Sequence, residues 1–87
     1  MSTLKQGSTG SEVRTLQDNL KKLGFALETD GSYGERTRNS VITLQTIFGY
    51  DVDGLAGTAT LKLVEQQVGY GWNLQAARKA FGDAAKS

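Results

Sequence analysis

The sequence predicts an all-α fold, a compact three-helix bundle with short Gly-containing loops. Three segments carry apolar residues at helical spacing, and a glycine follows the last apolar position of each, at residues 24, 49 and 69. Short connections between helices of this kind are typical of small bundles. With 87 residues, the chain has room for one domain.

The first predicted helix lies in the segment SEVRTLQDNLKKLG, residues 11–24. Ser11 is a suitable N-cap, and Gly24 stands where a left-handed residue would end the helix. The apolar residues of this segment follow one another at spacings of three, four and three, which places them on one helical face: Val13, Leu16, Leu20 and Leu23.

Two further helices are predicted at about 35–48 and 58–68. In the second, one stripe is formed by Thr37, Val41, Leu44 and Phe48, and Gly49 ends it. In the third, the inward face is expected to carry Leu61, Val64 and Val68, with Gly69 as the stop. We therefore assign residues 1–69 to the bundle.

Residues 70–87 form a C-terminal extension or connector that departs from this rhythm. Asn73 is positioned to cap a short fourth helix, with Leu74, Ala77 and Phe81 on one side. The extension either packs on the bundle or leads to another domain, and its Ala-rich, polar ending favours a connector.

Composition narrows the chemistry open to this chain. It contains no cysteine and no histidine, which removes disulfides, thiolate chemistry and the usual zinc ligands. The net charge of +1 gives no bulk attraction to nucleic acid or to an anionic membrane. No apolar run approaches the ~20 residues of a membrane span. We expect no metal, no cofactor, and neither nucleic acid nor membrane as a partner.

The most distinctive feature is a repeated pattern, D-G-x-x-G-x-x-T, which begins at Asp30 and again at Asp53. Each copy immediately precedes a predicted helix. The aspartate can accept hydrogen bonds from following backbone N–H groups, and the next glycine can take a positive φ. The pattern is therefore read first as the joint between a loop and a helix.

A calcium site is the alternative reading of duplicated D-G loops, and the spacing excludes it. A calcium loop needs oxygen ligands at positions 1, 3 and 5 and a bidentate glutamate at position 12. Counted from Asp30, position 12 holds Val41, and counted from Asp53 it holds Val64. One carboxylate per loop is too few for a hard cation.

Taken in order, three motif blocks resemble the small peptidoglycan-binding domain of bacterial and bacteriophage cell-wall hydrolases. The resemblance covers about residues 4–64. The matching residues are Gly7, Gly10, Val13, Leu16, Gln17, Leu20, Leu23, Gly24 and Phe25 in the first block, Asp30, Gly31, Tyr33, Gly34, Thr37, Val41, Leu44 and Gln45 in the second, and Asp53, Gly54, Gly57 and Thr60 in the third.

This resemblance implies a three-helix fold that binds peptidoglycan without catalysis and anchors or targets an attached cell-wall hydrolase, such as a phage endolysin. We expect a monomer that acts at the cell wall or in the periplasm. No signal-peptide apolar region follows Met1, so export would depend on a holin, a partner or a fused domain.

Recognition of peptidoglycan requires apolar surface for sugar faces together with amide, hydroxyl and arginine groups for polar edges. The candidate ligand-binding residues are Asp30, Tyr33, Arg36, Arg38, Gln17, Gln45 and Tyr50, and Trp72 is a further aromatic residue near a loop. Each also has a structural reading: a core ring for Tyr33, a solvated helix face for the arginines, and satisfaction of loop backbone for the glutamines. We place the ligand in a shallow groove between the first D-G loop and the neighbouring helix ends.

A glycosidase and a protein-interaction module are the two alternative functional classes. A glycosidase needs two carboxylates across a cleft, whereas glutamates on a small bundle usually face solvent. We therefore expect no enzymatic activity and no catalytic residues. A protein-interaction or structural module of a phage particle or a cell-envelope assembly stays open, because the same bundle can carry another binding face.

Overall fold

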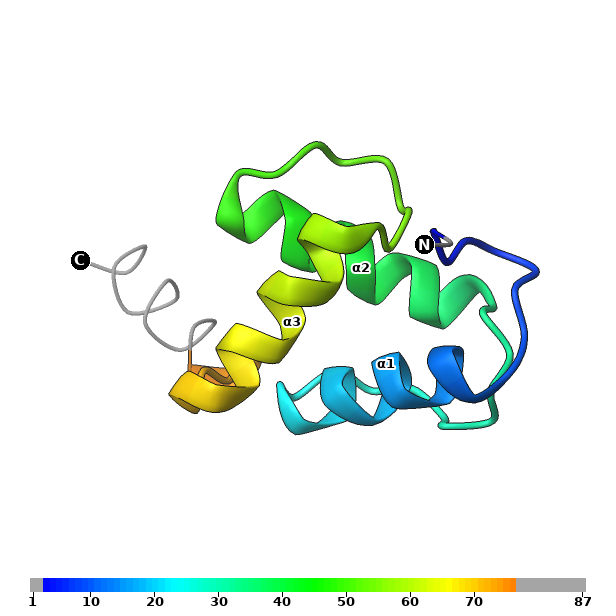
Figure 1. Cartoon of the computed structure of the whole chain (residues 1–87). Coiled ribbons are helices and arrows are strands. Elements are labelled where there is room, and N and C mark those ends of the chain that lie inside the picture. Colours follow the sequence, from blue (N-terminus) through cyan, green and yellow to red (C-terminus); the bar gives the residue numbers. More distant parts are fainter. Residues whose placement is uncertain (1–2, 77–87) are drawn as a thin grey trace.

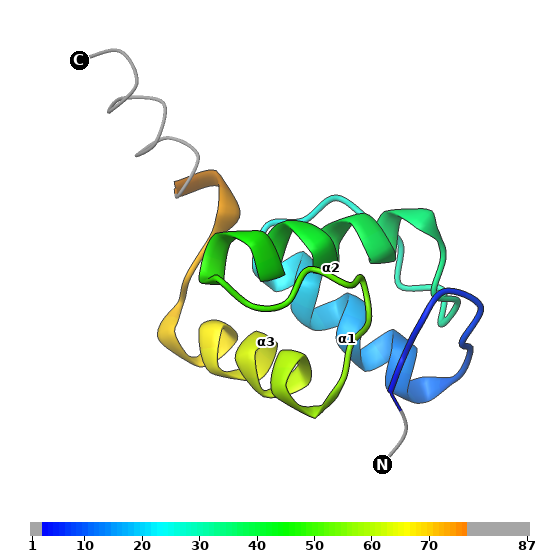
Figure 2. The ribbon, with the colours of Figure 1, turned by 90° about the horizontal axis from the view of Figure 1, so that it is seen from above.

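The computed structural model describes residues 3–76, which form three helices around one interior (Figure 1). Helix α1 spans Ser11–Lys22, α2 spans Glu35–Phe48 and α3 spans Thr58–Tyr70. Seen from above, α1 passes beneath α2, and α3 lies beside α1 (Figure 2). Residues 3–76 contain no extended strand, only two isolated antiparallel bridges, Leu4 with Ala56 and Thr9 with Ser32. The predicted all-α fold is confirmed.

The helix bounds agree with the sequence except at two ends. The N-cap position of α1 is Gly10 rather than Ser11, and no side chain caps that end. Helix α3 continues through Gly69 and ends with Gly71 in the left-handed conformation, at φ 76°. The prediction that Gly69 stops the helix is therefore wrong. A glycine two residues later provides the same left-handed C-cap, and it allows the Trp72 N–H to bond the Gln67 carbonyl at 3.0 Å.

The core is formed by the predicted stripes of α1 and α2 and by residues from the loops. Its buried apolar members are Leu4, Val13, Leu16, Leu20, Leu23, Phe25, Leu27, Tyr33, Val41, Leu44, Ala56, Leu63, Val64 and Leu74. In α3 the buried face is rotated from the prediction: Leu63 is buried, whereas Leu61 and Val68 are only partly buried. This rotation leaves Leu61 at a surface between α3 and α1.

The first residues of the C-terminal extension pack on the bundle. Leu74 is buried, and its N–H donates to the Leu23 carbonyl at 2.7 Å. Asn73 Oδ1 accepts from the Gln75 N–H at 2.9 Å, which confirms it as the cap of the helical turn at 74–76. Trp72 packs edge-on against Phe48, with ring centroids 5.3 Å apart.

These contacts differ from the expectation that the extension leaves the bundle as a connector, at least as far as residue 76. Burial of the Leu74 side chain stabilises the packed arrangement. This contribution was missed in the sequence because the extension was judged by its Ala-rich, polar ending. Ala77 and Phe81 lie outside the described residues. The division at residue 69 stays a prediction, and the contacts of Leu74 favour a later boundary.

Candidate functional site

A buried glutamine of α1 organises the first D-G loop. Gln17 Nε2 donates to Asp30 Oδ1 at 3.1 Å, to the Ser32 carbonyl at 2.9 Å and to Thr37 Oγ1 at 3.1 Å, and its Oε1 accepts from the Gly31 N–H at 2.9 Å. Asp30 Oδ1 also accepts from the Ser32 N–H at 3.0 Å. One amide thereby fixes the loop to α1 and to the first turn of α2.

A glutamine of α2 repeats this arrangement in the second D-G loop. Gln45 Nε2 donates to Asp53 Oδ1 at 3.0 Å, to the Leu55 carbonyl at 3.0 Å and to Thr60 Oγ1 at 3.2 Å, and Oε1 accepts from the Gly54 N–H at 3.1 Å. The Leu55 N–H donates to Asp53 Oδ1 at 2.9 Å. Every bond of the first joint has its counterpart here, so the repeated sequence pattern builds two equivalent joints.

This geometry explains why the repeated pattern begins with an aspartate followed by a glycine. Gly31 and Gly54 have φ 75° and 71°, which side chains rarely tolerate, and both are buried. The two aspartates are exposed. The hydrogen bond from the Ser32 N–H, and after it the bond from the Gln17 amide, lowers the pKa of Asp30 below its ordinary value. The Leu55 N–H and the Gln45 amide lower the pKa of Asp53 in the same way. Both aspartates therefore serve their loops as carboxylates.

Tyr33 lies in the core and connects the two joints. Its side chain is 1% exposed, and its hydroxyl donates to the Gly54 carbonyl at 2.7 Å. Burial raises the pKa of the Tyr33 hydroxyl to about 12. Gln17 and Gln45 are likewise 1% exposed. The contacts of Tyr33, Gln17 and Gln45 are therefore those of structural residues: a ring in the core and two amides that bond the loops.

An open hollow of about 370 Å³ lies at the first D-G loop, where the sequence analysis places the ligand groove. It brings together three of the predicted residues, Gln17, Asp30 and Arg36, of which Asp30 and Arg36 are exposed. The remaining lining residues are Leu27, Glu28, Ser32, Gly34, Glu35 and Thr37. Charges of both signs surround this hollow.

Tyr50 and Gln45 line a different hollow, of about 290 Å³, at the second D-G loop. Arg38 borders neither hollow but lies against the backbone of Gly54, where a methyl group added to the glycine would come within 3.1 Å of Arg38 Nε. The predicted ligand-binding residues are thus divided among two hollows, the core and, for Arg38, the exposed surface beside Gly54. Trp72 packs on Phe48 and borders neither hollow.

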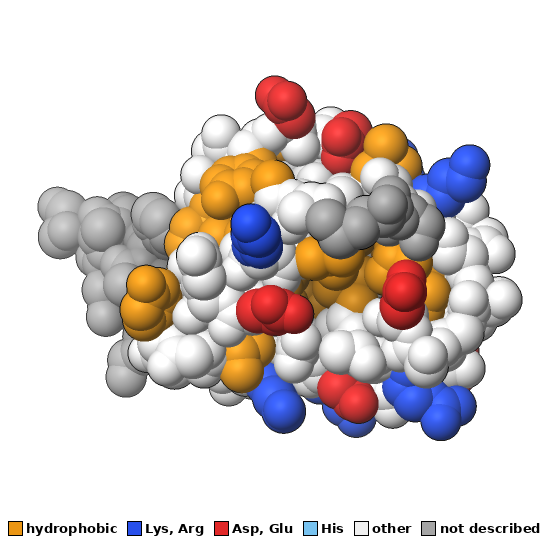
Figure 3. All heavy atoms as spheres, viewed as in Figure 1, with side chains coloured by type: hydrophobic (Ala, Val, Ile, Leu, Met, Phe, Trp, Pro, Cys, Tyr) orange, Lys and Arg blue, Asp and Glu red, His pale blue; other side chains and the backbone are white. Residues whose placement is uncertain are grey.

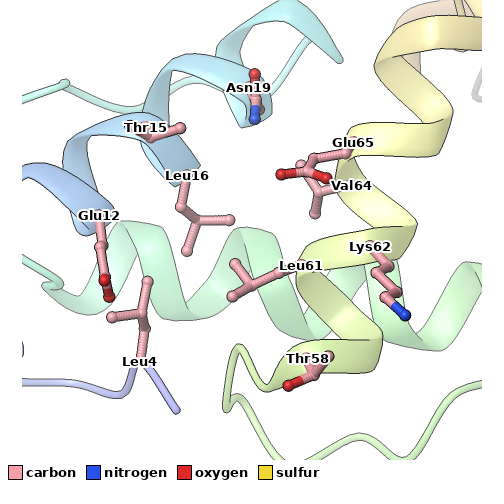
Figure 4. Close-up of a pocket in the computed structure, with 10 residues that line it drawn as sticks. All are labelled: Leu4, Glu12, Thr15, Leu16, Asn19, Thr58, Leu61, Lys62, Val64 and Glu65. Atoms are coloured by element: carbon pink, nitrogen blue, oxygen red, sulfur yellow. The ribbon is translucent and has the colours of Figure 1, made fainter. Parts of the chain in front are cut away.

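A larger hollow, of about 490 Å³, lies between α1 and α3, and sequence reasoning missed it. Leu16, Leu61 and Val64 point into it from the two helices, and Leu4 closes one end (Figure 4). Its polar rim consists of Glu12, Thr15, Asn19, Thr58, Lys62 and Glu65. In the space-filling view, hydrophobic side chains gather on this face between acidic ones (Figure 3).

This α1–α3 groove has an amphiphilic chemistry. Its floor offers apolar contact, while the rim offers an amide, two hydroxyls, an ammonium group and two carboxylates. The spacing of Glu12, Thr15 and Asn19 along α1 was the available signal, because these residues share one helical face beside Leu16. That signal becomes informative only once α3 is known to pack beside α1.

Residues 3–76 contain no group of three or more acidic, histidine or cysteine side chains able to hold a metal ion. Among the helices described, none has the length and apolar character needed to cross a membrane.

Comparison with known proteins identifies the class to which this fold and its joints belong. A family model described as "Putative peptidoglycan binding domain" matches residues 9–64, and the chain belongs to this family. Domains of the family are non-catalytic binding modules of cell-wall hydrolases and endolysins, and they act at the cell wall. The resemblance found in the sequence is confirmed.

The relatives include enzymes and isolated domains. The chain is 45% identical over 62 residues to the N-acetylmuramoyl-L-alanine amidase CwlL of Bacillus licheniformis, covering 68% of this chain and 17% of the amidase. The SleB N-terminal domain has a TM-score of 0.74 at 34% identity, covering 77% of this chain and 93% of that one. A Burkholderia AP3 phage endolysin has a TM-score of 0.69 at 36% identity, covering 72% and 24%. The chain spans about a quarter or less of the length of the curated relatives it matches.

Proposed function

We propose that this chain binds peptidoglycan through the α1–α3 groove and holds an attached catalytic domain at the cell wall. Membership of the peptidoglycan-binding family supports the ligand, and the apolar floor bordered by polar groups supports the place. The floor residue Leu61 carries the choice, because it is partly exposed and forms one contiguous apolar surface with Leu16 and Val64 between two polar rims.

The chemistry of the groove suits a polymer that has both apolar and polar parts. Sugar rings and acetyl methyl groups would lie over Leu16 and Leu61, while Asn19 would bond amide groups. Lys62 can contact a stem-peptide carboxylate, and Glu65 can contact an ammonium group.

The partners follow from the same proposal. Cell-wall hydrolases among the relatives support an attached catalytic domain, whose local concentration at the insoluble polymer would rise on binding. We propose that the chain acts as a monomer, without nucleic acid or membrane as a ligand. Export would depend on a holin, a partner or a fused domain.

The hollow at the first D-G loop is a secondary contact in this proposal. Arg36 is exposed there and can bond a stem-peptide carboxylate, and Arg38 lies farther along α2. Asp30 borders the same hollow. Gln17, Gln45 and Tyr33 would influence binding through the shape of the joints.

Co-sedimentation with purified sacculi tests the proposal. In Thr15→Trp, a large ring enters the α1–α3 groove from an exposed position, and we expect the bound fraction to fall by about tenfold or more. Thr46→Trp is the matched control, because Thr15 and Thr46 are both exposed helical threonines whose hydroxyls bond the carbonyl four residues earlier.

Three outcomes are informative in that experiment. Loss of sedimentation in Thr15→Trp but not in Thr46→Trp supports the groove. Equal sedimentation of both variants with the unchanged chain places the ligand elsewhere, and Arg36→Ala would then test the first hollow. Failure of the unchanged chain to sediment contradicts peptidoglycan binding and leaves the protein-interaction alternative.

A further inference from the structure

The two D-G loops border hollows whose linings correspond residue by residue. Apart from Thr3, each residue that lines the second hollow has a counterpart in the first. The counterpart of Gln45 is Gln17, 28 positions earlier, and every other counterpart lies 23 positions earlier. The duplicated joint thus creates two equivalent recesses. They lie beside opposite ends of α2, whose 14 residues span about 21 Å.

The substitutions between the two hollows change their chemistry. Buried Leu27 corresponds to Tyr50, which is 37% exposed, and Ser32 corresponds to Leu55, which is 39% exposed. At the next two helix-entry positions, Glu35 corresponds to Thr58 and Arg36 to Ala59. The second hollow has therefore gained an exposed aromatic ring and an exposed aliphatic side chain, and it has lost the charged pair at the helix entry.

The second hollow keeps hydrogen-bond acceptors beside this apolar surface. Asp51 and Asp53 are both exposed and line it. The two bonds that Asp53 accepts within residues 3–76 both go to Oδ1, so Oδ2 keeps its capacity to accept. Thr58, another exposed lining residue, adds a hydroxyl.

We propose that this second hollow is a subsite for a neutral N-acetylated sugar of the glycan strand, with Tyr50 as the surface on which the sugar face lies. The aromatic ring and Leu55 match the apolar face of a pyranose. Asp51 and Asp53 match the hydroxyl and amide N–H donors at its edge. This inference rests on the proposed peptidoglycan binding and adds a glycan contact beside the α1–α3 groove, with which the second hollow shares Thr58.

Charge selects the sugar over the stem peptide as the occupant. Two carboxylates line the hollow, and none of its lining residues is basic. These carboxylates would repel a peptide that carries carboxylates of its own, whereas an uncharged sugar would experience no such repulsion. The first hollow differs in carrying one basic residue, Arg36, beside the carboxylates of Glu28, Asp30 and Glu35, so that a peptide carboxylate has a partner there.

Titration of the full chain with the soluble β-1,4 tetramer of N-acetylglucosamine, followed by NMR, tests the subsite. We expect the amide signals of Leu55 and Ala59 to shift. Tyr50→Ala should weaken binding by about tenfold, because aromatic contacts of this kind contribute about 1.4 kcal/mol, whereas Tyr50→Phe should stay within about twofold. Tyr70→Ala is the control, since Tyr70 is 79% exposed and lines none of the three hollows described here.

The outcomes separate this inference from the proposed function. Shifts confined to the α1–α3 groove, equal affinity of Tyr50→Ala, or no binding of the tetramer would each overturn the subsite. The same spectra show whether Tyr50→Ala retains its fold. Sedimentation of the unchanged chain with sacculi decides peptidoglycan binding independently, so that a chain that sediments yet ignores the tetramer contradicts only the subsite.

Discussion

The hydroxyl of Tyr33 donates to the carbonyl of Gly54 at 2.7 Å and thereby joins two loops that lie 21 residues apart in the sequence. The ring that carries this hydroxyl is completely enclosed. Each D-G loop is fixed locally by its own glutamine, and Tyr33 fixes the two joints relative to one another. The mutual placement of the three helix entrances therefore depends on this bond and the packing of its ring, together with the backbone bonds that connect residues 4–10 to both loops.

Tyr33→Phe should destabilise the chain with little change in fold. The substitution keeps the ring but leaves the Gly54 carbonyl without its donor, at a cost of about 1–3 kcal/mol. The free energy of unfolding, measured in urea, checks this. Tyr70→Phe removes a hydroxyl from an exposed tyrosine and should change stability by less than about 0.5 kcal/mol. Equal effects of the two variants would contradict the finding.

Alkaline pH should destabilise the chain through the same residue. Burial raises the pKa of folded Tyr33 from 10.0 to about 12, so the unfolded chain loses this proton first. The contribution to stability is complete below pH 10, declines between pH 10 and 12, and levels off above. Urea unfolding from pH 8 to 12 should show a steeper decline for the unchanged chain than for Tyr33→Phe. Parallel curves would exclude Tyr33 as the cause.

Acid pH should destabilise the two joints through their aspartates. The folded pKa of Asp30 and of Asp53 lies below the unfolded value of 3.8, so their contribution is present above that pH and is lost as the pH falls through the folded pKa. Asp30→Asn/Asp53→Asn keeps an acceptor oxygen and removes the titration. Its stability should fall less steeply below about pH 4.

The control for that experiment removes two acidic charges from α1 instead. Glu12→Gln/Asp18→Asn alters exposed positions that belong to neither joint. Thermal unfolding between pH 2 and 6 compares the three proteins. An equally shallow acid limb in the control would attribute the effect to net charge rather than to the joints.

Gln17→Glu should be far more destabilising than its small chemical change suggests. The glutamate oxygen can still accept from the Gly31 N–H, but the three bonds that Nε2 donates are lost, and a carboxylate then faces Asp30. We expect a loss of roughly 2–4 kcal/mol in urea unfolding at pH 7. Gln66→Glu, at an exposed position of α3, makes the same change and should be nearly neutral. A comparable loss there would contradict the role of Gln17.

Leu74→Ala should reveal that the start of the C-terminal extension belongs to the bundle. Leu74 is buried in the core, so truncation should lower the free energy of unfolding by about 2–4 kcal/mol. Gln75→Ala changes the exposed neighbour and should have little effect. A neutral Leu74→Ala would restore the view of this segment as a connector.

Much of the fold is predictable because its signals are local. Helical periodicity and the glycines at helix ends give α1 and α2 to within a residue, and the D-G-x-x-G-x-x-T pattern gives both joints. The family could also be assigned in advance, because its motif consists of these same local features. The end of α3 was misplaced because two glycines, Gly69 and Gly71, offered the same stop.

The sequence by itself determined the three helices, the two aspartate–glycine joints and the family, since each depends on residues close together in the chain. Only the tertiary structure decided that Tyr33 is enclosed, that Leu61 lies in a groove between α1 and α3, and that Leu74 returns to the core. The physical reason is that burial depends on which helix faces are opposed, and one sequence pattern permits several such oppositions.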